Sequence, residues 1–225
     1  MTRLRSVLFR LFTLPLCLLM GAPAIAAELI ANANPMALYG SEILFDVYRN
    51  GDKVGFHRVR FAEDKDALVA RSLFQIDFKL LFFLPYRYAY KSEARWRNGA
   101  LVRLSADVDD DGDLFTLSAI RKGDLFEINT SDRRFTAKAP VFPTNHWNAA
   151  VIGETRVLNT VTGSINKVRI EATTRERVAT ELGDVEATRY SYSGDLRTTV
   201  WYDDQGRWVK KRFRGSDGSD IDYVC

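Results

Sequence analysis

Residues Tyr86 to Arg97 read YRYAYKSEARWR, and this stretch decides the fold class. One set of alternate positions is aromatic or small: Tyr86, Tyr88, Tyr90, Ser92, Ala94 and Trp96. The other set is almost entirely charged: Arg87, Ala89, Lys91, Glu93, Arg95 and Arg97. Because successive side chains of a strand point to opposite faces, the pattern predicts a strand with an aromatic inner face and a charged outer face. At about 3.3 Å per residue it spans roughly 40 Å, which suits the wall of a curved sheet or barrel.

Turn dipeptides divide the flanking sequence into similar β-rich runs. They include Asn50-Gly51, Asn98-Gly99, Asp111-Gly112, Gly183-Asp184 and Gly206 after Asp203-Asp204. Asn, Asp and Gly tolerate positive φ, so such pairs between alternating runs are strong hairpin signals. The spacing predicts an all-β, mainly antiparallel meander of roughly eleven strands, as one curved sheet or an open or partly closed barrel.

One segment in the middle of the chain interrupts this rhythm. Residues Ala139 to Pro143 favour an extended crossing, and Thr144 is a suitable N-cap for a short helix over Asn145 to Ile152. A second helical turn is expected near Thr155 to Thr160. An insert between two groups of hairpins would form a lid or plug on an open sheet.

The N-terminus has the features of an export signal. Three arginines precede an apolar run from Leu11 to Met20, and Ala24-Ile25-Ala26 forms a small-x-small cleavage site. The apolar run is about half the length that a membrane-spanning helix needs. We therefore expect residues 1–26 to be a cleaved signal peptide, 27–40 a flexible arm and 41–225 a single antiparallel β domain. The mature chain would be periplasmic or secreted and not an integral membrane protein.

Charge and cysteine content restrict the partners. The chain has 32 Lys and Arg against 29 Asp and Glu, and the leader contains three of the arginines and no acid, which leaves 29 of each in the mature part. A neutral chain has no excess charge for neutralising phosphates, so nucleic acid is not an expected partner. Cys17 lies in the leader, and Cys225 is then available only for an intermolecular disulfide.

The residues that could carry chemistry do not form a recognisable catalytic or metal-binding set. Residues Asp107 to Gly112 resemble the start of a calcium loop, but Ser118 stands where a bidentate Glu is needed, so a charged hairpin tip is the preferred interpretation. His57 falls in a strand, on a face expected to be exposed or half-buried. His146 lies in the crossing insert, where a structural role outweighs acid–base catalysis. We predict no metal, no cofactor and no assigned catalytic residue.

The apolar run from Leu80 to Leu84 has no alternation. It fits either a strand end that is buried on both sides or the apolar lip of a cavity or a surface patch.

Three stretches together resemble a family of exported bacterial β-proteins of unknown function. They are Phe45 to Gly51 with Val54-Gly55, Pro143-Thr144-Asn145-His146-Trp147, and Trp201 to Val209. The resemblance implies a single curved antiparallel β domain and transfers no activity. At the level of architecture alone, the expected domain is similar to the half-barrel lipoprotein carriers of the bacterial envelope.

The first functional hypothesis is non-enzymatic binding of an apolar small molecule or lipid-like group in an open barrel. Its predicted ligand-binding residues are Tyr86, Tyr88, Tyr90, Trp96, His146 and Trp147. The first alternative is a structural domain that docks on an envelope protein through a sheet edge or the Leu80–Leu84 run. The second is a hydrolase-type enzyme that uses His146 with an acid such as Asp46 or Asp203.

Overall fold

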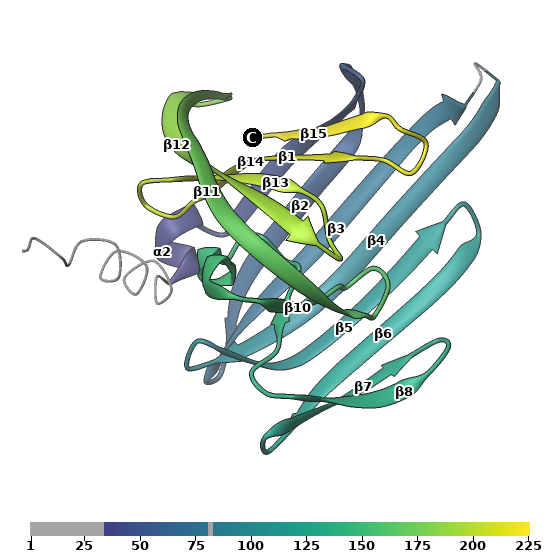
Figure 1. Cartoon of the computed structure of the whole chain (residues 1–225), viewed down its shortest axis with the longest axis vertical. Helices are drawn as coiled ribbons and strands as arrows, with labels where there is room; N and C mark the ends of the chain where they lie inside the picture. The colour runs from purple at the N-terminus through teal and green to yellow at the C-terminus, as the bar shows by residue number, and fades with distance from the viewer. Residues whose placement is uncertain (1–33, 81–82) are drawn as a thin grey trace, which may run out of the picture.

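The computed structural model describes residues 34–80 and 83–225, which form one curved sheet with a short helix at its N-terminal end (Figure 1). The elements in chain order are α2 (Pro35–Tyr39), β1 (Glu42–Arg49), β2 (Asp52–Asp64), β3 (Ala67–Leu80), β4 (Leu84–Arg97), β5 (Ala100–Asp110), β6 (Asp113–Lys122), β7 (Leu125–Thr130), β8 (Arg134–Lys138), β9 (Phe142–Pro143), the 3₁₀ helix η1 (Ala149–Gly153), β10 (Arg156–Leu158), β11 (Ile165–Thr180), β12 (Gly183–Gly194), β13 (Thr199–Asp203), β14 (Trp208–Arg214) and β15 (Asp220–Val224).

Consecutive strands pair as a meander, and the first and last strands, β1 and β15, pair with each other in the middle of the sheet. The strand order runs β8-β7-β6-β5-β4-β3-β2-β1-β15-β14-β13-β12-β11-β10-β9. β1 and β15 pair antiparallel, with Asp46 opposite Val224 and Arg49 opposite Ile221. The predicted all-β, mainly antiparallel open architecture is confirmed, and β9 with β10 is a parallel pair. β8 and β9 are the two edges of the sheet within the described residues.

The described sheet has 15 strands, more than the roughly eleven expected. The short strands β9 and β10, of two and three residues, account for part of the difference. Such strands are too short to display alternation, and they form only because neighbouring segments offer backbone partners.

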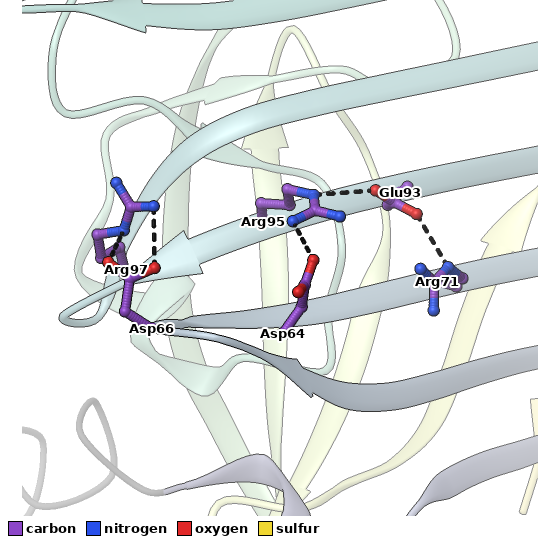
Figure 2. Close-up of polar contacts among 6 residues, drawn as sticks. All are labelled: Asp64, Asp66, Arg71, Glu93, Arg95 and Arg97. Atoms are coloured by element: carbon purple, nitrogen blue, oxygen red, sulfur yellow. Dashed lines mark hydrogen bonds and ion pairs between the residues drawn. The ribbon is translucent and has the colours of Figure 1, made fainter.

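The predicted faces of β4 are confirmed. Tyr90, Ala94 and Trp96 are buried. On the opposite face Arg95 pairs with Asp64 at 2.7 Å and with Glu93 at 3.1 Å, as Figure 2 shows. The charged positions therefore meet solvent and one another, while the aromatic positions face the interior.

The crossing insert contains the predicted short helix, but over a shorter range. The 3₁₀ helix starts at Ala149 instead of Asn145, and its N-cap is Asn148 instead of Thr144, with the Asn148 side chain accepting the Ala150 N–H at 3.0 Å. The predicted turn near Thr155 to Thr160 is instead strand β10. Of residues 141–147, Phe142 and Pro143 form β9 and His146 with Trp147 forms a turn, and most of the side chains in this segment are buried in the interior.

The described part of the predicted N-terminal arm contains a short helix. Asn34 accepts the Met36 N–H at 2.9 Å and caps helix α2. The predicted leader and residues 27–33 lie outside the described residues. Within the described residues, no helix has the length and apolar character to cross a bilayer.

The C-terminus is held in the sheet. The carbonyl oxygen of Cys225 accepts the Glu181 N–H at 2.7 Å, and the thiol is half-buried. Burial raises the pKa of this thiol, so it has little thiolate character near neutral pH.

Candidate functional site

A cavity of about 500 Å³ lies on the concave side of the sheet. Strands from both halves of the meander line it, together with the crossing insert and the loops that follow it. Seven aromatic side chains contribute to its wall: Phe74, Phe78, Tyr86, Tyr88, Tyr90, Phe213 and Tyr223. Its size falls within the range of pockets that hold small organic ligands.

Three of the predicted ligand-binding residues form one row along this wall. Tyr86, Tyr88 and Tyr90 come from alternate positions of β4 and all line the cavity. Tyr90 is the innermost and most buried, and its hydroxyl donates to Thr160 Oγ1 at 2.9 Å. Tyr86 lies at the solvent end of the row and donates to Asp110 at 2.5 Å. The row therefore presents apolar rings whose polar tips are engaged at both ends.

The crossing insert forms the inner boundary of the cavity. Asn145 and His146 are buried and line it. Two tyrosine hydroxyls hold the insert in place: Tyr202 donates to the His146 carbonyl at 2.8 Å, and Tyr39 donates to the Trp147 carbonyl at 2.8 Å. Buried backbone carbonyls need such partners, and here the two hydroxyls supply them. The insert, expected as a lid or plug, therefore forms an internal plug that side chains hold in place.

Two half-buried basic side chains, His57 and Lys211, line the cavity. The His57 ring packs among Phe45, Phe74, Trp208 and Tyr223. Burial lowers the pKa of His57 to about 3, so the imidazole is neutral.

Lys211 is the second of these basic side chains, and burial lowers its pKa to about 8. At neutral pH it carries most of its positive charge in an apolar surrounding.

Charged residues gather at the mouth of the cavity. Arg49 pairs with Asp217 at 2.7 Å, and its guanidinium lies 4.6 Å from the ring centre of Phe78. Hydrogen bonds from Arg49 and Ser219 hold the pKa of Asp217 well below its usual range. The mouth is therefore polar, with Arg49 and Asp217 paired, whereas aromatic rings line the interior.

The two predicted tryptophans do not line this cavity. The Trp96 and Trp147 rings pack against each other with centroids 5.5 Å apart, and Trp96 also contacts Phe142 at 5.3 Å. Both belong to the core, and they border a separate hollow of about 410 Å³ near the β4–β5 turn. Of the six predicted residues, the structure thus brings Tyr86, Tyr88, Tyr90 and His146 to one cavity and places Trp96 and Trp147 elsewhere.

The surroundings of His146 do not resemble a catalytic triad. Its Nδ1 lies 3.5 Å from the Tyr192 hydroxyl. Burial, with Lys211 and His57 nearby, places the pKa of His146 well below its ordinary value. The acids considered as its partners are engaged elsewhere: Asp46 binds Lys53 at 2.5 Å, and Asp203 binds Arg207 at 2.6 Å.

The acidic run Asp107 to Gly112 forms the end of β5 and the β5–β6 turn, as expected for a hairpin tip. Asp109 accepts the Gly112 N–H at 2.8 Å, and Asp111 has a φ of 52°. In residues 34–80 and 83–225, no group of three or more His, Cys, Asp or Glu side chains is arranged to hold a metal ion.

The β3–β4 tip is an apolar protrusion. Phe83 is 74% exposed and Leu84 is 51% exposed, so the buried strand end is wrong for these two residues. Residues 81 and 82 lie outside the described chain. The alternative, an apolar lip or surface patch, fits the exposed pair.

The sequence analysis missed Lys211 as a cavity residue. The signal was the alternation of Lys211 and Phe213 with Arg212 and Arg214 in β14, which places a lysine on the same face as a phenylalanine. Charged residues on both sides of the lysine concealed that alternation.

Comparison with known proteins supports the fold and adds the family. A crystal structure of a β-barrel-like protein of domain of unknown function DUF1849 from Brucella abortus is similar, with a TM-score of 0.58 and 10% sequence identity over 81% of this chain and 94% of that chain. At this identity the likeness concerns the fold alone. No curated protein matches the sequence. The model of one family, described as a domain of unknown function (DUF6134), matches residues 45–225, and the chain therefore belongs to the DUF6134 family.

Proposed function

We propose that this protein is an exported binding protein of the cell envelope that holds an apolar ligand, such as a lipid-like molecule, in the cavity of its open sheet. The observation that carries the proposal is the aromatic cavity of about 500 Å³, reached through a polar mouth. Export rests on the sequence of residues 1–26.

The packing of the plug supports binding as the role of this cavity. A core without a function closes around its side chains, because voids forfeit contacts on every side. Here the Tyr88 ring borders open space, while the insert behind it is fixed by the Tyr202 and Tyr39 hydroxyls. A preformed cavity of this kind needs little reorganisation to receive an apolar ligand.

Ligand capture tests the proposal. The complete coding sequence is expressed in a bacterial host, the accumulated protein is purified, and its organic extract is analysed by mass spectrometry. After extraction, the neutral dye Nile red is titrated with fluorescence detection. We expect saturable binding at one dye per chain.

A pair of tryptophan variants locates the binding site. Ile76→Trp fills the cavity wall and should abolish dye binding. Leu182→Trp, at a fully exposed turn residue, should leave it unchanged. Equal binding by both variants would place the dye outside the cavity and contradict the proposal.

The exposed tip favours a second function, docking on an envelope protein through Phe83 and Leu84. Cross-linking in cells would detect it. A stable protein partner that is lost in Phe83→Ser/Leu84→Ser, combined with a failure of Nile red to bind, would favour docking over ligand binding.

A further inference from the structure

Lys211 occupies an inward position on a strand whose other charged residues face outward. In the β13–β14 pairing Trp201 lies opposite Lys210 and Tyr202 opposite Trp208, so Val209 is a bulge. Lys210 then packs over Trp201 at 5.1 Å on one side of the sheet. Lys211 points to the other side, with Nζ 5.0 Å from the Phe213 ring centre and 5.1 Å from that of Tyr223.

The Phe213 and Tyr223 rings lie beside the Lys211 ammonium, but they supply no anion to pair with its charge. Cation–π contacts offset part of the lost hydration, yet an ammonium also has three N–H donors. None of the ion pairs or hydrogen bonds found among the described residues involves the ammonium of Lys211, whose recorded contacts are with the two rings. The carboxylates that line the cavity are engaged at its mouth, Asp217 with Arg49 and Asp110 with Tyr86.

Other polar atoms of the cavity wall also lack partners. Both ring nitrogens of His57 are buried and have no partner in the described part of the chain, and the same holds for Nδ2 of Asn145. His57 and His146 lie near enough to Lys211 to sense its charge. A neutral imidazole has one donor and one acceptor nitrogen, so the wall offers a positive charge and unpaired N–H donors of His57 and Asn145. An unpaired buried donor is costly.

We propose that the ligand is a long-chain carboxylic acid, an inference that rests on the proposed function. Its carboxylate binds Lys211 and His57, and its chain lies along the row of Tyr86, Tyr88 and Tyr90. One ammonium matches the single charge of a carboxylate. The fold already holds the half-buried Lys211 side chain against two aromatic rings, so the ligand gains a preorganised partner. Arg197 also lines the cavity, but it is exposed at the mouth, where solvent screens its charge.

The test compares ligands that differ only at the head. Nile red is displaced from the extracted full-length protein by palmitate, methyl palmitate or 1-hexadecanol at pH 7. We expect palmitate to bind about tenfold to a hundredfold more tightly than the ester or the alcohol, as for a hydrogen-bonded charge. Lys211→Met should bring the three affinities together, whereas Arg197→Met should keep the preference for the acid.

The outcomes separate this inference from the proposed function. Equal affinities for acid, ester and alcohol in the wild-type protein would overturn the carboxylate inference and leave apolar binding standing. Failure of Nile red and all three ligands to bind would overturn both. If Lys211→Met does not fold, NMR of ¹³C-carboxyl palmitate bound to the wild-type protein provides the test, because it measures the pKa of the bound carboxyl group. A carboxyl pKa below that of exposed palmitate supports the inference, and one above it contradicts it.

Discussion

Lys211 and Tyr223 face each other across β14 and β15, and the lysine Nζ lies 5.1 Å from the centre of the tyrosine ring. This pair places a cation against the apolar wall of the cavity. Such an arrangement lowers stability unless a ligand supplies the missing anion.

Removing the cation should therefore stabilise the empty protein. Lys211→Met keeps an unbranched stem of similar length, and we expect the free energy of unfolding at pH 7 to rise by about 1–3 kcal/mol. Urea unfolding of both proteins at a fixed pH measures this difference in the free energy of unfolding. A loss of stability would mean that the ammonium has an anionic partner in the folded protein.

The same lysine predicts a pH dependence above neutrality. Its pKa is 10.5 in the unfolded chain and about 8 in the fold, so between these values the unfolded state binds more protons and stability rises with pH. His57 and His146 stay neutral throughout this range, and the buried tyrosines Tyr88 and Tyr223 have pKa values raised by burial, so they remain protonated in the fold. Unfolding measured at pH 8 and pH 10 should show that the wild-type protein gains stability relative to Lys211→Met. Parallel pH profiles would contradict the placement of Lys211.

Acid should weaken the fold through the two histidines. His57 and His146 are neutral in the fold and take up protons once unfolded, so stability falls as the pH drops below about 6.5. His57→Leu should reduce the slope between pH 6.5 and 4.5 by up to about 1.4 kcal/mol per pH unit. Thermal or urea unfolding across this range measures the slope, and an unchanged slope would mean that His57 is accessible to water.

The register of β4 predicts that substitutions at neighbouring positions lower the stability of the fold by unequal amounts. Trp96→Ala removes a buried ring from the core and should cost about 3–5 kcal/mol. Arg95→Ala removes ion pairs on the solvent face and should change stability little. Chemical denaturation of the two variants would show comparable losses only if the assigned faces were wrong.

Gly55 is required by a close approach of two strands. A Cβ at this position would lie 1.9 Å from the carbonyl oxygen of Gln75 in β3. Gly55→Ala should therefore cost at least about 2 kcal/mol, since the clash is with backbone. Gly153→Ala is the matched control, because its Cβ would meet no atom within 4 Å. Their melting temperatures should differ by several degrees, and similar values would refute this strand spacing.

Local patterns in the chain determined the strands and their faces. The alternation of Tyr86 to Trp96 sets the inner wall of β4, and Asn-Gly turns such as Asn50-Gly51 set the hairpins, because side-chain period and allowed φ are local properties of the chain. The alternation also placed Tyr86, Tyr88 and Tyr90 among the candidate residues, the crossing insert added His146, and all four line the cavity.

Tertiary structure alone decided which inward residues border a cavity and which fill the core. Trp96 has the same alternation as Tyr90, but it meets Trp147 and Phe142 from the plug, whereas Tyr88 borders open space. For the plug, the sequence predicts a helix from Asn145, whereas the structure has a 3₁₀ helix over Ala149–Gly153 alone. The conformation of the plug depends on the hydroxyls of Tyr39 and Tyr202, which come from distant parts of the chain. Pairing of β1 with β15 likewise brings Tyr223 beside Phe74, and contacts between segments so far apart leave no periodic signal in either.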